Sequence, residues 1–177
     1  MTRKQFVHAL RAAAAVLGTK EVLVIGSQAV HGSMTKAFPA ASRSIEVDIA
    51  LINDIDGRAA DLIDGSIGEA SIFQDTFGYY AQGVECSTAI LPEGWQKRLV
   101  PFTSPDAPGV KALCLELHDL WISKAMAGRP KDREFCEQLL SGKYVKVTTL
   151  ESRLKKVNDQ PEEKIELAKS WIHSKKK

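Results

Sequence analysis

The sequence predicts an α/β (α+β) fold in residues 1–115 and a C-terminal helical part in residues 116–177. Short apolar runs of strand length alternate with amphipathic segments as far as Leu115. Every later segment has the apolar spacing of a helix. A chain of 177 residues suits one domain, or one domain with a small appendage. We therefore expect the helical part to pack on the α/β domain.

The composition is that of an ordinary soluble protein, with 44% hydrophobic and 26% charged residues. A net charge of +2 is too small to indicate a nucleic-acid-binding protein, and we interpret the basic run Lys175–Lys177 as a solvated helix end. The cysteines Cys86, Cys114 and Cys136 have no zinc or disulfide spacing, which favours free thiols. No segment reaches the ~20 apolar residues of a membrane span. These observations predict a cytoplasmic protein with no membrane partner.

The first elements follow from apolar periodicity. Apolar residues recur at every third or fourth position from Arg3 to Leu17, which predicts a helix ending at the glycine that follows. Val22–Ile25 is a continuous apolar run, typical of a central strand buried on both faces. Ile45–Ile52 alternates and predicts a second strand. A helix is predicted over Asp56–Ile67, with Asp54 or its first residue as the cap.

The next elements are shorter. Gly78–Ala81 and Val84–Leu91 predict two strands, with Gly83 as a turn or bulge between them. Leu99–Phe102 and Lys111–Leu115 predict two more, on either side of a loop that contains proline and glycine. The α/β character ends with this last strand.

The remaining segments predict four helices. Their expected ranges are Leu117–Met126, Pro130–Leu140, Thr149–Val157 and Glu162–Ile172. Proline stands at the start of the second and, as Pro161, directly before the fourth, where it is tolerated.

The turn Gly26-Ser27 follows the first strand and opens a predicted short helix. A glycine allows the backbone to approach a phosphate, and the serine hydroxyl and the first helical amides can donate hydrogen bonds to it. Many α/β loops contain glycine only for packing, so the turn alone does not indicate a nucleotide site.

Glu46 and Asp48 lie two residues apart on the second strand, so both side chains project from one face. Ile45, Val47 and Ile49 are expected on the opposite, buried face. Two adjacent carboxylates repel each other, and a bound cation removes that penalty. Two interpretations fit the pair equally well. One is a magnesium site, and the other is an edge strand whose acidic face is solvated.

Lys124 shares one stripe of the first C-terminal helix with Leu117, Leu120 and Trp121. A lysine on an apolar stripe either extends its ammonium group to solvent or reaches a site where it neutralises phosphate charge. Asp132 and its basic neighbours stand at the break before the next helix, where capping and ion pairing are the common roles.

Taken together, these residues resemble the DNA polymerase β-type (minimal) nucleotidyltransferase superfamily, whose signature is a Gly-Ser turn followed on the next strand by paired carboxylates. More closely, the chain resembles a bacterial family of small, functionally uncharacterised nucleotidyltransferase-like proteins. The resemblance is carried by Val24–Ala29, Ser44–Ile49, Phe77–Val84, Leu91–Trp95 with Arg98–Val100, and His118–Asp132. The last stretch is also similar to the toxin nucleotidyltransferases of abortive-infection toxin–antitoxin systems.

The resemblance implies a nucleotidyltransferase palm with a mixed β-sheet flanked by helices, and a helical C-terminal part. It implies Mg²⁺-dependent transfer of a nucleoside monophosphate from an NTP to an acceptor such as tRNA or a protein. It further implies a toxin role with a cognate antitoxin as partner. The implied metal ligands are Glu46, Asp48 and Glu85; the implied nucleotide-binding residues are Gly26, Ser27 and Gln28; and the implied catalytic residues are Asp48, Glu46 and Lys124.

Two departures from the superfamily pattern leave a second interpretation open. Met34–Arg43 lengthens the spacer between the turn and the carboxylates, and Glu85 is a third carboxylate that no motif fixes. The alternative is a catalytically degenerate nucleotidyltransferase fold that binds a nucleotide or a partner. A metal-dependent phosphohydrolase ranks last, because the sequence has no His-Asp motif to support it.

Overall fold

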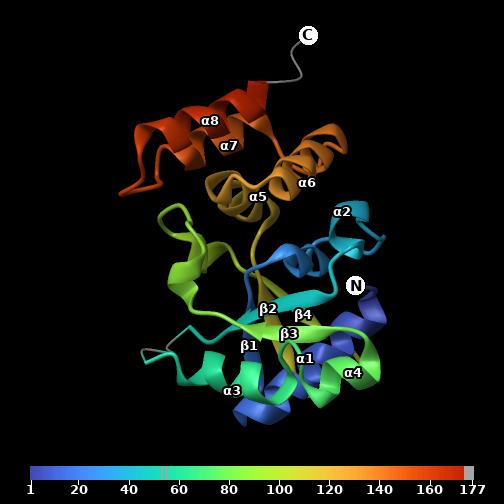
Figure 1. Ribbon diagram of the computed structural model, residues 1–177. Coiled ribbons are helices and arrows are strands. Elements are labelled where there is room, and N and C mark those ends of the chain that lie inside the picture. Colours follow the sequence, from blue (N-terminus) through green and yellow to red (C-terminus); the bar gives the residue numbers. More distant parts are fainter. Residues whose placement is uncertain (53, 55, 174–177) are drawn as a thin grey trace. The chain divides into compact units, whose positions relative to one another are not determined.

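The computed structural model of the chain describes residues 1–52, 54 and 56–173 (Figure 1). The predicted helix end at residues 175–177 lies outside this range. The chain forms two compact units, one of residues 1–88 and 99–115 and the other of residues 89–98 and 116–177. Within the described ranges, no helix is both long enough and apolar enough to span a membrane.

The first unit contains a mixed sheet whose strand order is β3-β2-β1-β5-β4. Its strands are β1 (Glu21–Val24), β2 (Glu46–Ala50), β3 (Tyr80–Gly83), β4 (Val100–Thr103) and β5 (Lys111–Cys114). β1 pairs antiparallel with β2 and parallel with β5, while β2 and β3 run parallel. β1 is central, and its last three residues are fully buried, as the apolar run predicts. The α/β class with a mixed sheet flanked by helices is confirmed.

Helices α1 (Arg3–Leu17), α3 (Arg58–Ile67) and α4 (Ile72–Phe77) lie together on one side of the sheet in Figure 1. The predicted helix over residues 3–17 is confirmed, and Gly18 ends it in the left-handed conformation. The N-cap position of α3 is taken by Gly57 and not by either of the predicted aspartates, but the Asp54 carboxylate accepts hydrogen bonds from the Ala59 and Ala60 amides in the first turn.

The segment before and after β3 differs from the prediction. The first expected strand is present as β3, shifted by two residues, and the second is absent, with a 3-10 helix η2 (Cys86–Thr88) in its place. Helix α4, directly before β3, was not predicted. Gly83 lies inside the strand, where an added Cβ would stand 2.0 Å from the Ala60 carbonyl oxygen of α3. The prediction that Ile45 is buried is also wrong: β2 begins one residue later, and Ile45 is half exposed.

The second unit is helical over residues 116–173, as predicted for this stretch, and it also includes residues 89–98. It contains the 3-10 helix η3 (Trp95–Arg98) and the helices α5 (Leu117–Ala127), α6 (Pro130–Ser141), α7 (Val147–Leu154) and α8 (Glu162–His173). α5 contacts each of the other three α-helices and carries the buried core side chains Leu120, Trp121 and Ile122. The three cysteines are free, as their spacing predicts, and Cys114 and Cys136 are buried.

Candidate functional site

The glycine of the turn and the second carboxylate of β2 lie against each other. β1 and β2 pair with Val24 opposite Ile49, and the Ile25 amide donates to the Asp48 carbonyl oxygen over 3.3 Å. A Cβ added to Gly26 would stand 1.5 Å from Asp48 Oδ2 and 2.9 Å from Asp48 Cβ. The backbone of Gly26 is extended, so close approach rather than a left-handed conformation requires the glycine. The structure thus brings together the two motifs that the sequence analysis singled out.

Glu46 and Asp48 share one face of β2 and are both half-buried, whereas Val47 and Ile49 on the other face are fully buried. This alternation confirms the predicted projection of the two carboxylates. In β3, Tyr80 is the register partner of Glu46.

Tyr80 holds Glu46 in place. Its hydroxyl group donates a hydrogen bond to Glu46 Oε2 over 3.1 Å. Burial, followed by the charge and hydrogen bond of Glu46, raises the pKa of Tyr80 to about 12, so the hydroxyl remains a protonated donor. No local pattern in the sequence marks Tyr80, because strand pairing places it beside a residue 34 positions away.

Ser27 and Gln28 begin the short 3-10 helix η1 (Ser27–Gly32), and both are buried. The Gln28 amide nitrogen donates to Ser27 Oγ over 3.3 Å and to the Ala41 carbonyl oxygen over 3.0 Å. Ala41 belongs to helix α2 (Pro39–Ser42), which is part of the long spacer between the turn and β2. The spacer is therefore fastened to the turn, and Gln28 supports Ser27. Nucleotide contacts by Ser27 and Gln28 stay predictions.

Glu85 lies beyond the end of β3. Its Oε2 accepts a hydrogen bond from Ser87 Oγ over 3.1 Å, and its Oε1 lies 3.5 Å from the position of a Cβ added to Gly57. In the part of the chain that the structure describes, no three His, Cys, Asp or Glu residues form a group that could hold a metal ion. A metal role for Glu85 stays a prediction.

Lys124 lies in the helical unit, where its ammonium group meets a buried carboxylate. Its Nζ is 3.6 Å from Asp132 Oδ1 and 5.8 Å from the centre of the Phe135 ring. Asp132 is 2% exposed and also accepts hydrogen bonds from Arg129 Nε and Nη2, at 2.6 Å and 3.2 Å. The predicted ion pairing at the break between α5 and α6 is therefore present.

A second buried carboxylate, Asp119 of α5, joins two arginines that are distant in sequence. It accepts hydrogen bonds from Arg98 Nε at 2.7 Å and Nη2 at 3.1 Å, and from Arg153 Nη1 at 3.0 Å. Arg98 also donates to the carbonyl oxygens of Pro92 and Glu93. The segment 89–98 is thereby tied to α5 and α7.

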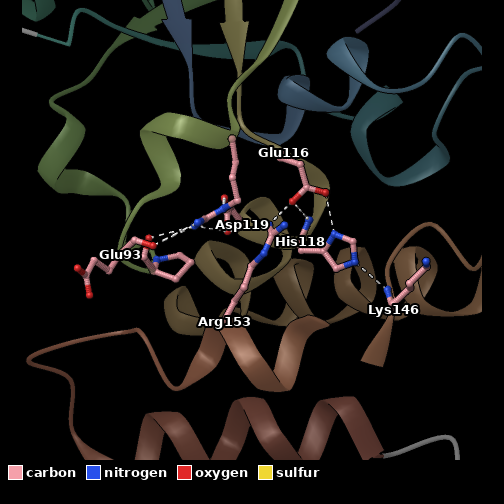
Figure 2. A network of polar contacts seen from close by, with 8 residues as sticks. Glu93, Glu116, His118, Asp119, Lys146 and Arg153 are labelled. Carbon is pink, nitrogen blue, oxygen red and sulfur yellow. Dashed lines mark hydrogen bonds and ion pairs between the residues drawn. The ribbon is translucent and has the colours of Figure 1, made fainter. Parts of the chain in front are cut away.

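Glu116 and His118 extend this network at the start of α5 (Figure 2). Burial works to raise the pKa of Glu116, but hydrogen bonds from His118 and Arg153, together with the positive charge of Arg153, outweigh it and lower the pKa to about 2. His118 Nδ1 is 2.7 Å from Glu116 Oε1, and its Nε2 accepts a hydrogen bond from the Lys146 amide. Two stretches that carry the family resemblance, around Arg98 and around Asp119, are therefore partners in one structural network.

The donor atoms around the Gly26–Asp48 contact are suited to a hard divalent cation. Glu46 and Asp48 offer carboxylate oxygens on one face of the sheet, the ligands that Mg²⁺ prefers. The turn leaves room for the Asp48 carboxylate only because residue 26 has no side chain. The residues present therefore fit the metal that the resemblance implies.

Comparison with known proteins adds a family to this geometry. Residues 4–177 match the sequence profile of the family described as "Nucleotidyltransferase of unknown function (DUF6036)". The chain belongs to this family. No curated protein and no solved structure matches it. The match spans both units, so the helical unit is as much a part of the family's pattern as the sheet.

Proposed function

We propose that this nucleotidyltransferase transfers a nucleoside monophosphate from an NTP to an acceptor in a Mg²⁺-dependent reaction. The observation that carries the proposal is the close contact between Gly26 and Asp48. In this contact, a turn that a phosphate can approach lies against a face of the sheet that bears two carboxylates. Family membership supports the reaction class.

In this proposal Glu46 and Asp48 hold Mg²⁺, which when bound neutralises phosphate charge and lowers the barrier to attack at the α-phosphorus. Tyr80 keeps Glu46 oriented through its hydrogen bond. Gly26 and Ser27 contact the triphosphate, with Gln28 fixing the serine hydroxyl. The acceptor oxygen bonds to the α-phosphorus as the bond to the pyrophosphate oxygen breaks, so catalysis rests on positioning and electrostatics.

The proposed class of acceptor is based on the stretch 118–132, which resembles toxin nucleotidyltransferases. We assign tRNA or a protein as acceptor, and a cognate antitoxin as the partner that restrains the activity. Expression of wild-type protein should then arrest bacterial growth, whereas expression of Asp48→Asn should not. Equal growth in both strains would remove the toxin role and leave the donor site untouched.

The donor site is tested by calorimetric titration of ATP, GTP, CTP and UTP, each with and without Mg²⁺. Wild-type protein should bind at least one NTP only when Mg²⁺ is present, and Asp48→Asn should lose that binding while keeping its circular dichroism spectrum. Asp106→Asn, which removes an exposed carboxylate of the same unit, is the matched control and should bind normally. Absence of NTP binding by wild-type protein would contradict the proposal and favour a degenerate fold.

A further inference from the structure

The strand next to the two carboxylates places a neutral oxygen donor beside Asp48. β2 and β3 run parallel, with Tyr80 opposite Glu46 and Gln82 opposite Asp48. Register partners on neighbouring strands lie about 4.8 Å apart and project from the same face. Gln82 is exposed, whereas Ala81 and Gly83, which alternate with it, are buried. Gln82 therefore stands on the carboxylate face, next to Asp48.

We infer that the Gln82 side-chain carbonyl is the third protein oxygen ligand of the magnesium site, an inference that rests on the proposed metal role of Glu46 and Asp48. Amide carbonyls bind hard cations through oxygen, as carboxylates do, but bring no charge. Glu85 is less suitable, because it lies beyond the end of β3 and so is not opposite either carboxylate of β2.

The neutrality of Gln82 determines which metal complex the site takes. Glu46 and Asp48 together carry two negative charges, which balance one divalent cation. A second cation would have no further charged ligand from the protein, because the described residues place no third carboxylate, histidine or cysteine in a metal-binding group with them. The site is therefore suited to a single Mg²⁺ that arrives with the triphosphate, whose oxygens complete the coordination. The free metal ion binds weakly.

Substitution of Gln82 tests this assignment with little risk to the fold, because Gln82 is an exposed residue of the edge strand. The probe is Mn²⁺ alone, followed by electron paramagnetic resonance, since Mn²⁺ takes the same oxygen ligands as Mg²⁺. Gln82→Glu should bind free Mn²⁺ about tenfold or more tightly than wild type, and Gln82→Ala should bind it several-fold more weakly. Gln160→Glu adds the same charge in the helical unit and should match wild type.

The inference is overturned if Gln82→Glu binds free Mn²⁺ no better than wild type, or if Gln82→Ala binds a Mn²⁺–NTP complex as tightly as wild type. Calorimetry with Asp48→Asn distinguishes failure of the Gln82 assignment from failure of the proposed metal site. If Asp48→Asn loses metal-dependent NTP binding while both Gln82 variants have wild-type affinity for the metal and the nucleotide, the proposed function stands and Gln82 is not a metal ligand. If Asp48→Asn binds the Mg²⁺–NTP complex normally, the metal site itself is wrong.

Discussion

Asp48 occupies the space that a side chain at position 26 would need. Its Oδ2 lies 1.5 Å from the ideal position of a Gly26 Cβ, although the two residues are 22 positions apart in sequence. Antiparallel pairing of β1 and β2 produces this contact, because it carries the turn after β1 alongside the carboxylate face of β2. The glycine of the turn and the aspartate of the strand are thus one structural feature.

Gly26→Ala should weaken Mg²⁺-dependent NTP binding about tenfold or more, because the added methyl group displaces the Asp48 carboxylate. Calorimetric titration of the NTP measures the loss. Gly65→Ala is the matched control, since an added Cβ there meets no atom within 4 Å and lies within helix α3, where alanine is the better helix former. Wild-type affinity in Gly26→Ala would mean that the position of Asp48 does not matter for binding.

Tyr80→Phe should reduce the affinity for Mn²⁺ several-fold, because Glu46 loses the hydrogen bond that orients it. Electron paramagnetic resonance measures the bound metal. The fold should lose only about 0.5–1.5 kcal/mol, typical of one hydrogen bond. Tyr79→Phe removes the neighbouring hydroxyl, which bonds His8 instead, and should leave metal affinity unchanged. The same loss in both variants would assign the effect to general destabilisation of β3.

Lys124→Met should weaken binding of the Mg²⁺–NTP complex and leave binding of Mn²⁺ alone unchanged, because its predicted role is to neutralise phosphate charge. Asp132 keeps its partner Arg129, so the helical unit should remain folded. Lys97→Met, which removes an exposed charge of the same unit, serves as the control for net charge. Identical nucleotide affinities for Lys124→Met and wild type would restrict Lys124 to ion pairing.

Arg98→Lys should destabilise the helical unit by about 2–4 kcal/mol, because a lysine cannot replace both hydrogen bonds to the buried Asp119. Urea unfolding followed by tryptophan fluorescence reports on this unit specifically, since Trp95, Trp121 and Trp171 all belong to it. Arg133→Lys, at an exposed pair with Glu137, should cost less than about 0.5 kcal/mol. Equal stabilities of the two variants would refute the structural role of the Arg98–Asp119 pair.

His31 should make stability depend on pH between about 4 and 6.5. Burial, followed by the positive charges of Arg3 and the N-terminus, lowers its pKa from 6.5 to about 4. In that window the unfolded chain binds a proton that the folded chain does not, so stability is full above pH 6.5 and falls as the pH drops toward 4. The loss is on the order of 3 kcal/mol. His31→Phe, which can keep the stacking on Phe6, should flatten the profile; an unchanged slope would contradict the assignment.

The sequence predicts the elements whose signals are local. The long helix α1, the buried strand β1 and the four C-terminal helices follow from periodicity and caps within single segments. Helix α4 was not predicted, because Ile72–Phe77 is too short to show a periodic pattern. The only local signal for it is Ser71, which caps its first turn.

The candidate site was predictable only in part, because some of its contacts depend on strand register. Gly26 and Asp48 carry motifs that can be recognised in sequence. Tyr80 and Gln82 acquire their places beside the carboxylates from pairing with β2, which no local pattern records. For the same reason, Arg98 and Asp119 could be noticed as separate stretches but not as partners.

The most direct test of the central claim is a crystal structure of wild-type protein with Mn²⁺ and an α,β-methylene NTP analogue, with the anomalous signal of manganese recorded. The account predicts a manganese peak bound by the carboxylates of Glu46 and Asp48, with the triphosphate against the Gly26-Ser27 turn. A nucleotide bound without manganese at these two carboxylates, or manganese at a different place, would contradict it.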